Sequence, residues 1–298
     1  MVMESVENLY VTKFRDMIHV RAQQLVARTR PAVQFIDVKP GDVAAYDGMG
    51  HVEARQVTTR FAPIQFDDIE HNRRQLSRSD FTVVLPFSGY DIEGTLLNPT
   101  SRYADACVRA MERQFDRTVY GAMFATVNTG QQFQTPLTAA ADGVVTVNAT
   151  GGLTLAKLLD ADQNFWDAEV GNDFNLRKFI GLSGEENTTL LQIQQLTDSR
   201  YTNNAGRLDN AQRNRSYMDF EVIPFGANTT IPVLQVASGV RTSFIMVEGA
   251  IAFGMWKDWT IEIDRRKDLH DTTQVQITGT FGAVRTEGVL IQELTTTV

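Results

Sequence analysis

The residues best suited to chemistry in this 298-residue sequence are clustered carboxylates, four histidines, a serine between glycines and one cysteine. Asp67, Asp68 and Glu70 could bind a cation if their side chains converged, but we favour a charged loop face for them. The histidines are widely separated and have no H-E-x-x-H or C-x-x-C companion: His19, His51, His71 and His270. We therefore predict no metal site and no cofactor.

Motifs of nucleophilic catalysis are also missing. Gly181-Leu182-Ser183-Gly184 departs from the G-x-S-x-G elbow by one residue, and Ser183 with Glu186 matches a helix-capping box instead. Cys107 lies on an apolar helical stripe, which indicates a small buried side chain. Core packing is the simplest interpretation of Trp166, Trp256 and Trp259. The sequence thus predicts a protein that is not an enzyme, although a two-domain α+β enzyme with a site assembled from scattered residues stays as an alternative.

Composition indicates a globular chain with a sizeable core. Hydrophobic residues make up 43%, charged residues 21%, and no apolar run is long enough to cross a membrane. The net charge of −8 argues against a protein that grips nucleic acid over its whole surface. The first 30 residues nevertheless have a charge of +2, so the rest has −10. Only six of the 28 basic residues are lysine, and the excess of arginine is a weak indication of assembly.

An amphipathic helix is predicted from Ser5 to about Arg28, ahead of any domain, and Pro31 should end it. Phe14, Met17 and Ile18 belong to its apolar stripe. A lone N-terminal helix can bury such a stripe only on its own domain or on a neighbouring subunit, and both remain possible at this point.

A charged, lysine-free segment from Gly50 to Asp80 follows, and we interpret it as a long hairpin whose extended pieces are 51–60 and 81–87. Its opposite charges sum to zero and occur in blocks: Glu53, Arg55, Arg60, Asp67, Asp68, Glu70, Arg73, Arg74, Arg78 and Asp80. Such blocks suit pairing with another copy of the chain, and equally suit a solvated loop. We select as candidate contacts Arg55, Arg60, Asp67, Asp68, Glu70, Arg73, Arg74 and Arg78, together with Phe14, Met17 and Ile18.

The remaining elements predict an α+β fold. Asn98-Pro99 should open a long helix that ends near Thr126, on the order of 40 Å in length at ~1.5 Å per residue. A compact lobe is expected between about Val147 and Val236, with a helix over 153–170, a strand over 179–182 and another over 220–225. Alternation around Ile261 to Ile263 and Val275 to Ala283 predicts an antiparallel strand pair, and 289–294 should close that sheet.

The order of these features resembles the major capsid proteins of tailed bacteriophages with the Hong Kong 97-type fold. The stretches that carry the resemblance are Thr58-Thr59-Arg60-Phe61, His71-Asn72-Arg73-Arg74, Leu97-Asn98-Pro99-Thr100-Ser101-Arg102-Tyr103, Glu248-Gly249-Ala250-Ile251-Ala252-Phe253-Gly254 and Gly282-Ala283-Val284-Arg285. The resemblance implies an N-terminal arm (1–30), an E-loop (48–80), a P-domain (31–47, 81–146 and 237–298) and an A-domain (147–236).

The function implied by the resemblance is an icosahedral head shell of hexamers and pentamers around packaged double-stranded DNA, assembled in the host cytoplasm. The DNA contact would be weak and non-specific, and other partners would be a portal, a decoration or cement protein and a separate scaffolding protein, or no scaffold. Because no lysine occurs between Lys39 and Lys157, we expect noncovalent cohesion without E-loop cross-links. A bacterial nanocompartment shell of the same fold, which encloses protein cargo, is the alternative.

The hairpin interpretation makes one testable claim at this point. Reversing Arg73 and Arg74 to glutamate should leave the subunit folded but block shells.

Overall fold

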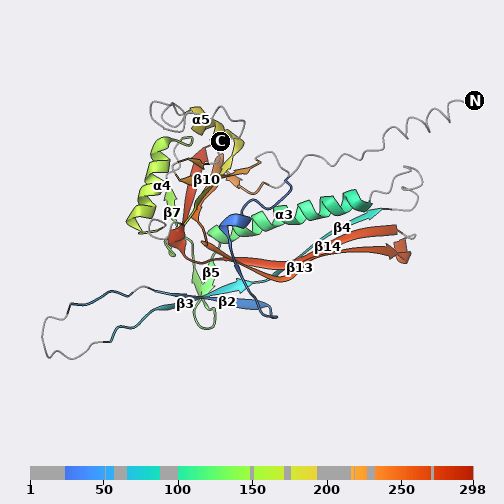
Figure 1. Ribbon diagram of the computed structural model, residues 1–298, viewed down its shortest axis with the longest axis horizontal. Helices are drawn as coiled ribbons and strands as arrows, with labels where there is room; N and C mark the ends of the chain where they lie inside the picture. The colour runs from blue at the N-terminus through green and yellow to red at the C-terminus, as the bar shows by residue number, and fades with distance from the viewer. Residues whose placement is uncertain are drawn as a thin grey trace, which may run out of the picture.

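A computed structural model describes residues 24–50, 52–56, 66–87, 100–147, 151–170, 176–192, 216–217, 219–226, 232–269 and 272–297. Among these residues the strands form three sheets around one long helix, α3 (Thr100–Phe124). Figure 1 shows α3 lying along a pair of long strands, with a lobe at one end and a thin hairpin that points away from both. The expected α+β architecture is confirmed.

The helix α3 has 25 residues and packs on a four-stranded sheet of order β1-β13-β14-β4. These strands are β1 (Gln34–Ile36), β13 (Ile251–Arg266), β14 (Thr272–Arg285) and β4 (Ser79–Phe87). Side chains four residues apart on α3 are buried against Phe253, Val275 and Phe281 of the sheet: Cys107, Met111, Phe115, Val119 and Met123. The predicted long helix and the antiparallel β13–β14 pair are both confirmed. The predicted Asn98-Pro99 start lies outside the described residues.

Cys107 is fully buried in this core, as expected for a small apolar side chain. Burial raises the pKa of the Cys107 thiol, which disfavours the reactive thiolate. Trp256 and Trp259, on β13, also pack against buried residues. Gly282 is required where β14 passes the chain at Ser77, because a Cβ there would lie 2.1 Å from the Ser77 carbonyl oxygen.

The lobe contains a seven-stranded sheet of order β7-β15-β12-β8-β10-β9, with β11 paired to β12. Its members are β7 (Val145–Val147), β8 (Lys178–Ser183), β9 (Ser216–Tyr217), β10 (Phe220–Phe225), β11 (Val236–Ala237), β12 (Val240–Val247) and β15 (Ile291–Thr297). Helices α4 (Leu155–Asp167) and α5 (Gly184–Gln192) belong to the same lobe. Leu158, Ala161 and Phe165 of α4 pack on Ile180, Val222 and Leu294 of the sheet.

Two predictions about the end of the chain are wrong. Residues 289–294 were expected to close the β13–β14 sheet, but β15 pairs with β12 and β7 in the lobe. The lobe was expected to end near Val236, but β12 lies at the centre of its sheet. Both β12 and β15 contribute apolar side chains to the lobe core, including Ile245 and Leu294, and this burial draws them into the lobe.

A third sheet, of order β2-β3-β5-β6, forms the base of the hairpin. It contains β2 (Val43–Met49), β3 (His71–Ser77), β5 (Val127–Thr129) and β6 (Thr135–Leu137). The predicted hairpin exists, but its paired arms are β2 and β3 rather than 51–60 and 81–87. The stretch 81–87 pairs with β14 instead, because the partly buried side chains of Phe81 and Val83 pack against the main core.

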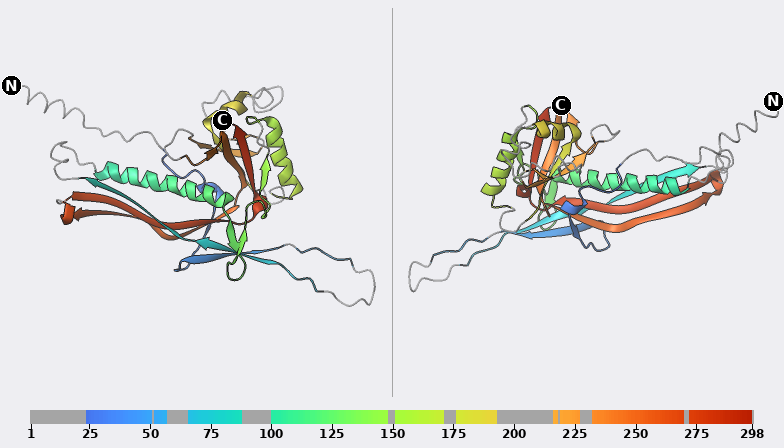
Figure 2. Two further views of the ribbon diagram at one scale, coloured as in Figure 1. Left: turned by 180° about the vertical axis from the view of Figure 1, so that it is seen from behind. Right: turned by 45° about the horizontal axis from the view of Figure 1, so that its top comes forward.

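Short 3₁₀ helices complete the described structure: η1 (Arg30–Ala32), η3 (Lys267–Leu269) and η4 (Gly288–Leu290). Residues 24–29 are not helical, so the predicted N-terminal helix does not extend to Arg28. Figure 2, which turns the molecule in two directions, shows the lobe standing off one end of α3 and the hairpin leaving near the same end.

The predicted capping box at the start of α5 is confirmed by reciprocal hydrogen bonds. The Ser183 backbone N–H donates to Glu186 Oε2 at 2.8 Å, and the Glu186 N–H donates to Ser183 Oγ at 3.3 Å. Ser183 Oγ also accepts a hydrogen bond from Arg241 Nη1 at 2.7 Å.

We predict that Ser183→Ala lowers the free energy of unfolding by about 1–2 kcal/mol, measured by urea denaturation. An unchanged denaturation midpoint would show that the capping box adds nothing to stability.

Candidate subunit-contact surfaces

The described residues of the hairpin arms, 43–50, 52–56 and 66–77, project from the body of the protein, as Figures 1 and 2 show. They expose large apolar side chains: Met49 is 67% exposed and Phe66 is 94% exposed. A soluble subunit gains nothing from apolar side chains on a projecting arm, whereas an interface between proteins can bury them. The arms are therefore suited to contact another molecule.

Two ion pairs join charged side chains along the hairpin arms. Arg55 Nη2 lies 2.5 Å from Asp67 Oδ1, and Arg73 donates to both carboxylate oxygens of Asp47, at 2.6 and 3.2 Å. Hydrogen bonding to Arg73 holds the pKa of Asp47 below its usual value. Such exposed ion pairs contribute little to the free energy of unfolding. These charged side chains can therefore exchange their partners for charges of another molecule in an interface.

The other candidate charges of the hairpin are placed as follows. Arg78, after β3, lies 3.5 Å from Asp42 and 3.3 Å from Asp80. Asp68 and Glu70 are exposed, and the Glu70 carbonyl oxygen accepts a hydrogen bond from the Gly50 N–H at 2.8 Å. Arg60 lies outside the described residues.

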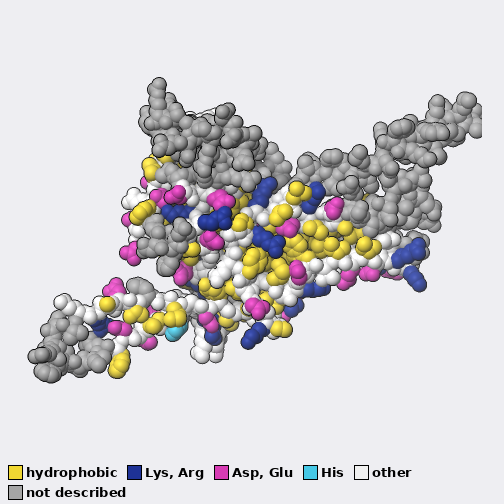
Figure 3. Space-filling view, in the orientation of Figure 1, with side chains coloured by type: hydrophobic (Ala, Val, Ile, Leu, Met, Phe, Trp, Pro, Cys, Tyr) yellow, Lys and Arg dark blue, Asp and Glu magenta, His cyan; other side chains and the backbone are white. Residues whose placement is uncertain are grey.

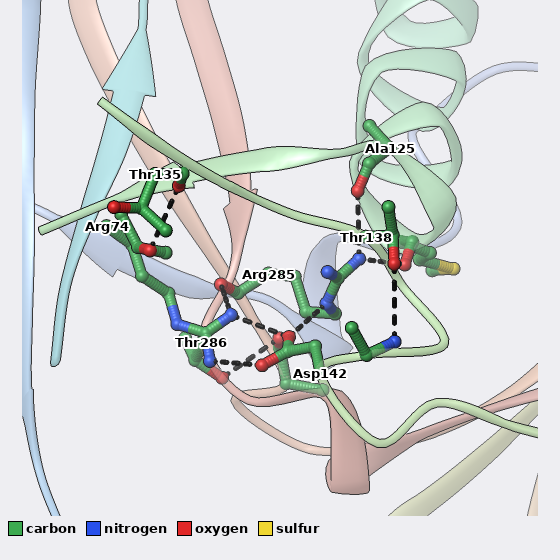
Figure 4. Close-up of polar contacts among 11 residues, drawn as sticks. Arg74, Ala125, Thr135, Thr138, Asp142, Arg285 and Thr286 are labelled. Carbon is green, nitrogen blue, oxygen red and sulfur yellow. Dashed lines mark hydrogen bonds and ion pairs between the residues drawn. The ribbon is translucent and has the colours of Figure 1, made fainter. Parts of the chain in front are cut away.

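Arg74 differs from the other candidates because it points into the protein. Its two terminal nitrogens donate to the two carboxylate oxygens of Asp142, each at 2.6 Å, and its side chain is only 5% exposed. Arg285, at the end of β14, donates from Nε to Asp142 Oδ2 at 2.6 Å. Figure 4 shows the three side chains converging between the end of α3 and the hairpin base. We call this group the Arg74–Asp142–Arg285 cluster.

The cluster also closes the C-terminal end of α3. Arg285 Nη1 donates to the carbonyl oxygens of Met123 and Ala125, at 2.7 and 3.1 Å (Figure 4). Cationic donors stabilise the last carbonyls of a helix, which have no partner within the helix. The Arg285 Nη2 atom is buried and has no hydrogen-bond partner among the described residues. The cluster therefore joins α3, β14, the hairpin base and the loop that holds Asp142.

Burial alone would raise the pKa of Asp142, but the hydrogen bonds and charges of Arg74 and Arg285 outweigh it and lower that pKa. A glutamate at position 74 would place a second carboxylate against Asp142 in the interior. The expectation that a chain with both Arg73 and Arg74 reversed still folds is therefore corrected. A substitution that reverses the side-chain charge is therefore a suitable test of assembly at Arg73 but not at Arg74.

Sequence reasoning missed Asp142 and Arg285 as partners of Arg74. The burial of Arg285 could have been inferred from its position in β14. It follows Phe281 and Ala283 at intervals of two residues, and it is buried. A charge at such a position needs a buried counter-charge. Nothing in the sequence near Asp142 indicates that it is this partner, because 143 residues separate it from Arg285.

The segment before η1 is fixed to α3 by two buried carboxylates. Asp116 accepts hydrogen bonds from the N–H groups of Arg28 and Thr29, at 3.1 and 3.0 Å, and from Thr29 Oγ1 at 2.7 Å. Glu112 accepts one from the Ala27 N–H at 2.7 Å, and burial raises the pKa of Glu112. These bonds hold 27–29 in a non-helical conformation. The apolar candidates Phe14, Met17 and Ile18 lie outside the described residues.

The outer face of α4 presents a second exposed apolar surface. Trp166 is 60% exposed and Leu159 is 50% exposed, so the interpretation of Trp166 as a core residue is wrong. The helix buries the neighbouring positions Leu158 and Phe165 instead. Figure 3 shows hydrophobic and acidic side chains interspersed over the region of α4.

An open cavity of about 750 Å³ lies between the hairpin base and the lobe, lined in part by Gly48, Asn72, Leu176 and Val289. Arg74 and Asp142 also line it, but their polar atoms bind each other. Among the described residues no group of three histidine, cysteine or carboxylate side chains could hold a metal ion. Within the same part of the chain, no helix is long and apolar enough to span a bilayer.

Comparisons with known proteins agree with this geometry. A family model described as phage capsid protein matches residues 6–291. The fold is similar to that of a chain from Mycobacterium phage Che8 (TM-score 0.70, 11% identity, 94% of each chain covered). It is also similar to the capsid of the cyanophage P-SCSP1u (TM-score 0.69, 10% identity, covering 98% of this chain and 94% of the other).

A further similar structure is the capsid of Helicobacter pylori bacteriophage KHP30 (TM-score 0.72, 9% identity, covering 95% of this chain and 94% of the other). No curated protein matches the sequence.

Proposed function

This chain belongs to the phage capsid protein family, and from that premise we propose how its surfaces build a shell. The protein is a major capsid protein, a structural component of the icosahedral phage head that associates with copies of itself. The family match over residues 6–291 is the observation that carries this conclusion, and it favours a phage head over a cargo-enclosing nanocompartment. The protein is located in the virion capsid, and we propose that the capsid assembles in the host cytoplasm.

We propose that the chain works without catalysis, because its role is to contribute contact area. A standard protein interface buries roughly 1,200–2,000 Å², and a shell subunit shares several of them. The projecting hairpin is one such contact surface, as the E-loop. In this proposal Met49, Phe66 and the paired charges of Arg55, Asp67 and Arg73 bind the adjacent copy.

The domain division follows from the same proposal, with boundaries adjusted to the sheets. The P-domain comprises α3 and the β1-β13-β14-β4 sheet, and the A-domain comprises the lobe, to which β12 and β15 are added. The N-terminal arm extends to about residue 30, where Asp116 and Glu112 fix it to α3. Copies arranged as hexamers and pentamers would form the shell.

The proposed partners beyond the chain itself are a portal, a decoration or cement protein, and a separate scaffolding protein or none. Packaged double-stranded DNA would be bound weakly and without sequence preference. The net charge of −8 supports this, because a subunit that does not grip phosphates lets a compact genome move in and out of the shell.

Electron microscopy of the purified protein tests the proposed function directly. Closed shells, with DNA in particles from infected cells, are the expected result. A monomer or small oligomer at every concentration and salt condition would contradict self-assembly. Shells that enclose a protein and no nucleic acid would favour the nanocompartment alternative.

The role of the hairpin charges makes a separate prediction. Arg73→Glu should leave the melting temperature within about 2 °C of the wild type, because exposed pairs contribute little, yet reduce the yield of shells severalfold. Sedimentation and electron microscopy measure the yield. The control is the exchange Asp47→Arg with Arg73→Asp, which restores the local pair with opposite polarity. If the exchanged chain assembles normally, Arg73 serves only its local pair and not the neighbour.

A further inference from the structure

The exposed face of α4 contains an apolar row with a tryptophan at one end. Leu155, Leu159 and Trp166 recur at positions i, i+4 and i+11, which places them in one row along the helix. Leu159 and Trp166 are exposed, and Leu155 is half-buried. The opposite face of α4 is buried in the lobe core. An exposed apolar row on a well-packed helix indicates a surface that another molecule covers.

Trp166 is held in place rather than left to move. Its indole Nε1–H donates to Asp162 Oδ2 at 3.2 Å, and Asp162 Oδ1 accepts a hydrogen bond from Lys178 Nζ at 2.7 Å. Lys178 is itself fixed, since its ammonium group lies over the rings of Phe165 and Phe220, 5.7 and 5.8 Å from their centroids. A large aromatic side chain that is ordered before binding loses less entropy in an interface, which is a property of binding hot spots.

The surroundings of this row are acidic. Asp160, Asp167 and Glu169 are exposed on or next to α4, while its basic residue, Lys157, is buried and donates to the Gly151 and Thr295 carbonyl oxygens. A partner of α4 should therefore combine basic groups with apolar ones.

The sequence contains such a partner. Residues 200–215 include four arginines and one aspartate, a net charge of +3, with Tyr201 and Leu208 as apolar companions. Arginine is well suited to this surface because it pairs with carboxylates and stacks on tryptophan.

The two surfaces come from different segments of the chain. Residues 200–215 lead directly into β9, which is an edge strand of the lobe sheet. Helix α4 bonds instead to β15 and β8 of that sheet: Gln292 of β15 donates to the Ala161 carbonyl oxygen at 2.9 Å, and Lys178 of β8 donates to Asp162 at 2.7 Å. A closed ring of subunits needs two different, complementary surfaces on each copy, since each contact is head to tail.

We propose that the α4 face around Trp166 binds the arginine-rich segment 200–215 of the adjacent copy, as the contact between lobes within a capsid ring. This inference rests on the proposed shell function and specifies one of its interfaces. The segment 200–215 acts here as the ligand of a preformed surface: its arginines pair with Asp160 and Asp167, and its apolar residues cover Trp166.

Charge exchange between the two surfaces tests this contact. We expect Asp160→Arg with Asp167→Arg to reduce the shell yield about tenfold or more, and Arg207→Glu with Arg213→Glu to do the same. A chain with all four changes should regain at least half of the wild-type yield, because the charges are complementary again. Trp166→Ala should reduce the yield about tenfold, and Trp166→Phe, which keeps a ring, should have a smaller effect.

Several outcomes would overturn the inference. If the chain with all four substitutions assembles no better than the chains with either pair of substitutions, the two surfaces do not contact each other. A drop of more than about 5 °C in the melting temperature of the unassembled subunit for either pair would place the contact within one copy. Normal shells from Trp166→Ala would remove the α4 face from the interface. Failure of the wild type to form shells would instead contradict the proposed function.

Discussion

Asp142→Ala should lower the free energy of unfolding by about 3–5 kcal/mol, among the largest effects expected for a single substitution in this chain. The change leaves the guanidinium groups of Arg74 and Arg285, 5% and 0% exposed, without the carboxylate that both of them bind. Two buried cations then lie close together without a counter-charge. Denaturant unfolding of the unassembled subunit measures the loss.

The matched control is Asp47→Ala, which removes a carboxylate that also binds an arginine with two hydrogen bonds. The Asp47 side chain is 60% exposed, so its loss should cost less than about 1 kcal/mol. If the two substitutions lower the free energy of unfolding by similar amounts, burial adds nothing to the stabilising effect of the Arg74–Asp142–Arg285 cluster.

The same cluster predicts a dependence on pH. Because the pKa of Asp142 is lowered in the folded protein, its stabilising contribution is complete above its usual value of 3.8 and is lost as the pH falls through the lower, folded value. The melting temperature of Asp142→Asn should therefore fall less steeply than that of the wild type in this acidic range. Parallel curves for the two proteins would contradict this assignment.

Asp116→Ala should lower the free energy of unfolding by about 2–4 kcal/mol. Asp116 is fully buried and accepts hydrogen bonds from Arg28, Thr29 and the Gln24 side chain. Without the carboxylate, the buried Thr29 N–H and hydroxyl have no acceptor, and the segment before η1 is released from α3. Trypsin should then cleave after Arg28 much faster than in the wild type.

Asp105→Ala is the control for this prediction, because Asp105 is an exposed carboxylate on the same helix. It should change stability by less than about 0.5 kcal/mol and leave trypsin cleavage unchanged. If Asp116→Ala and Asp105→Ala behave alike, the carboxylates of α3 do not fix the N-terminal segment.

The sequence was sufficient to predict elements whose signals are local. The stripe of α3, the alternation of β13 and β14 and the capping box of Ser183 and Glu186 all depend on residues close together in the chain, and all are confirmed. Sheet membership was harder to predict, because an apolar strand such as β15 fits either core. Its place was decided by packing against β12, which begins about fifty residues earlier.

The contact surfaces were predictable only in part. A run of charged residues indicates a surface, but it does not distinguish Arg73, which is exposed, from its neighbour Arg74, which is buried. Alternation along β3 provides the only local sign, since Leu76 is buried two residues after Arg74. Trp166 shows the opposite error: its apolar character predicted burial, whereas the turn of α4 points it outward.

The Arg74–Asp142–Arg285 cluster lies at the root of the hairpin, and Arg74 is a residue of one hairpin arm. Three buried charged side chains thus help to attach the hairpin to the body of the protein. A change of angle at this root would displace the exposed Phe66, which is eight residues from Arg74 along the arm, further than the buried carboxylate. In the shell proposed above, the packing around Asp142 therefore helps to set the angle at which each hairpin meets the adjacent copy.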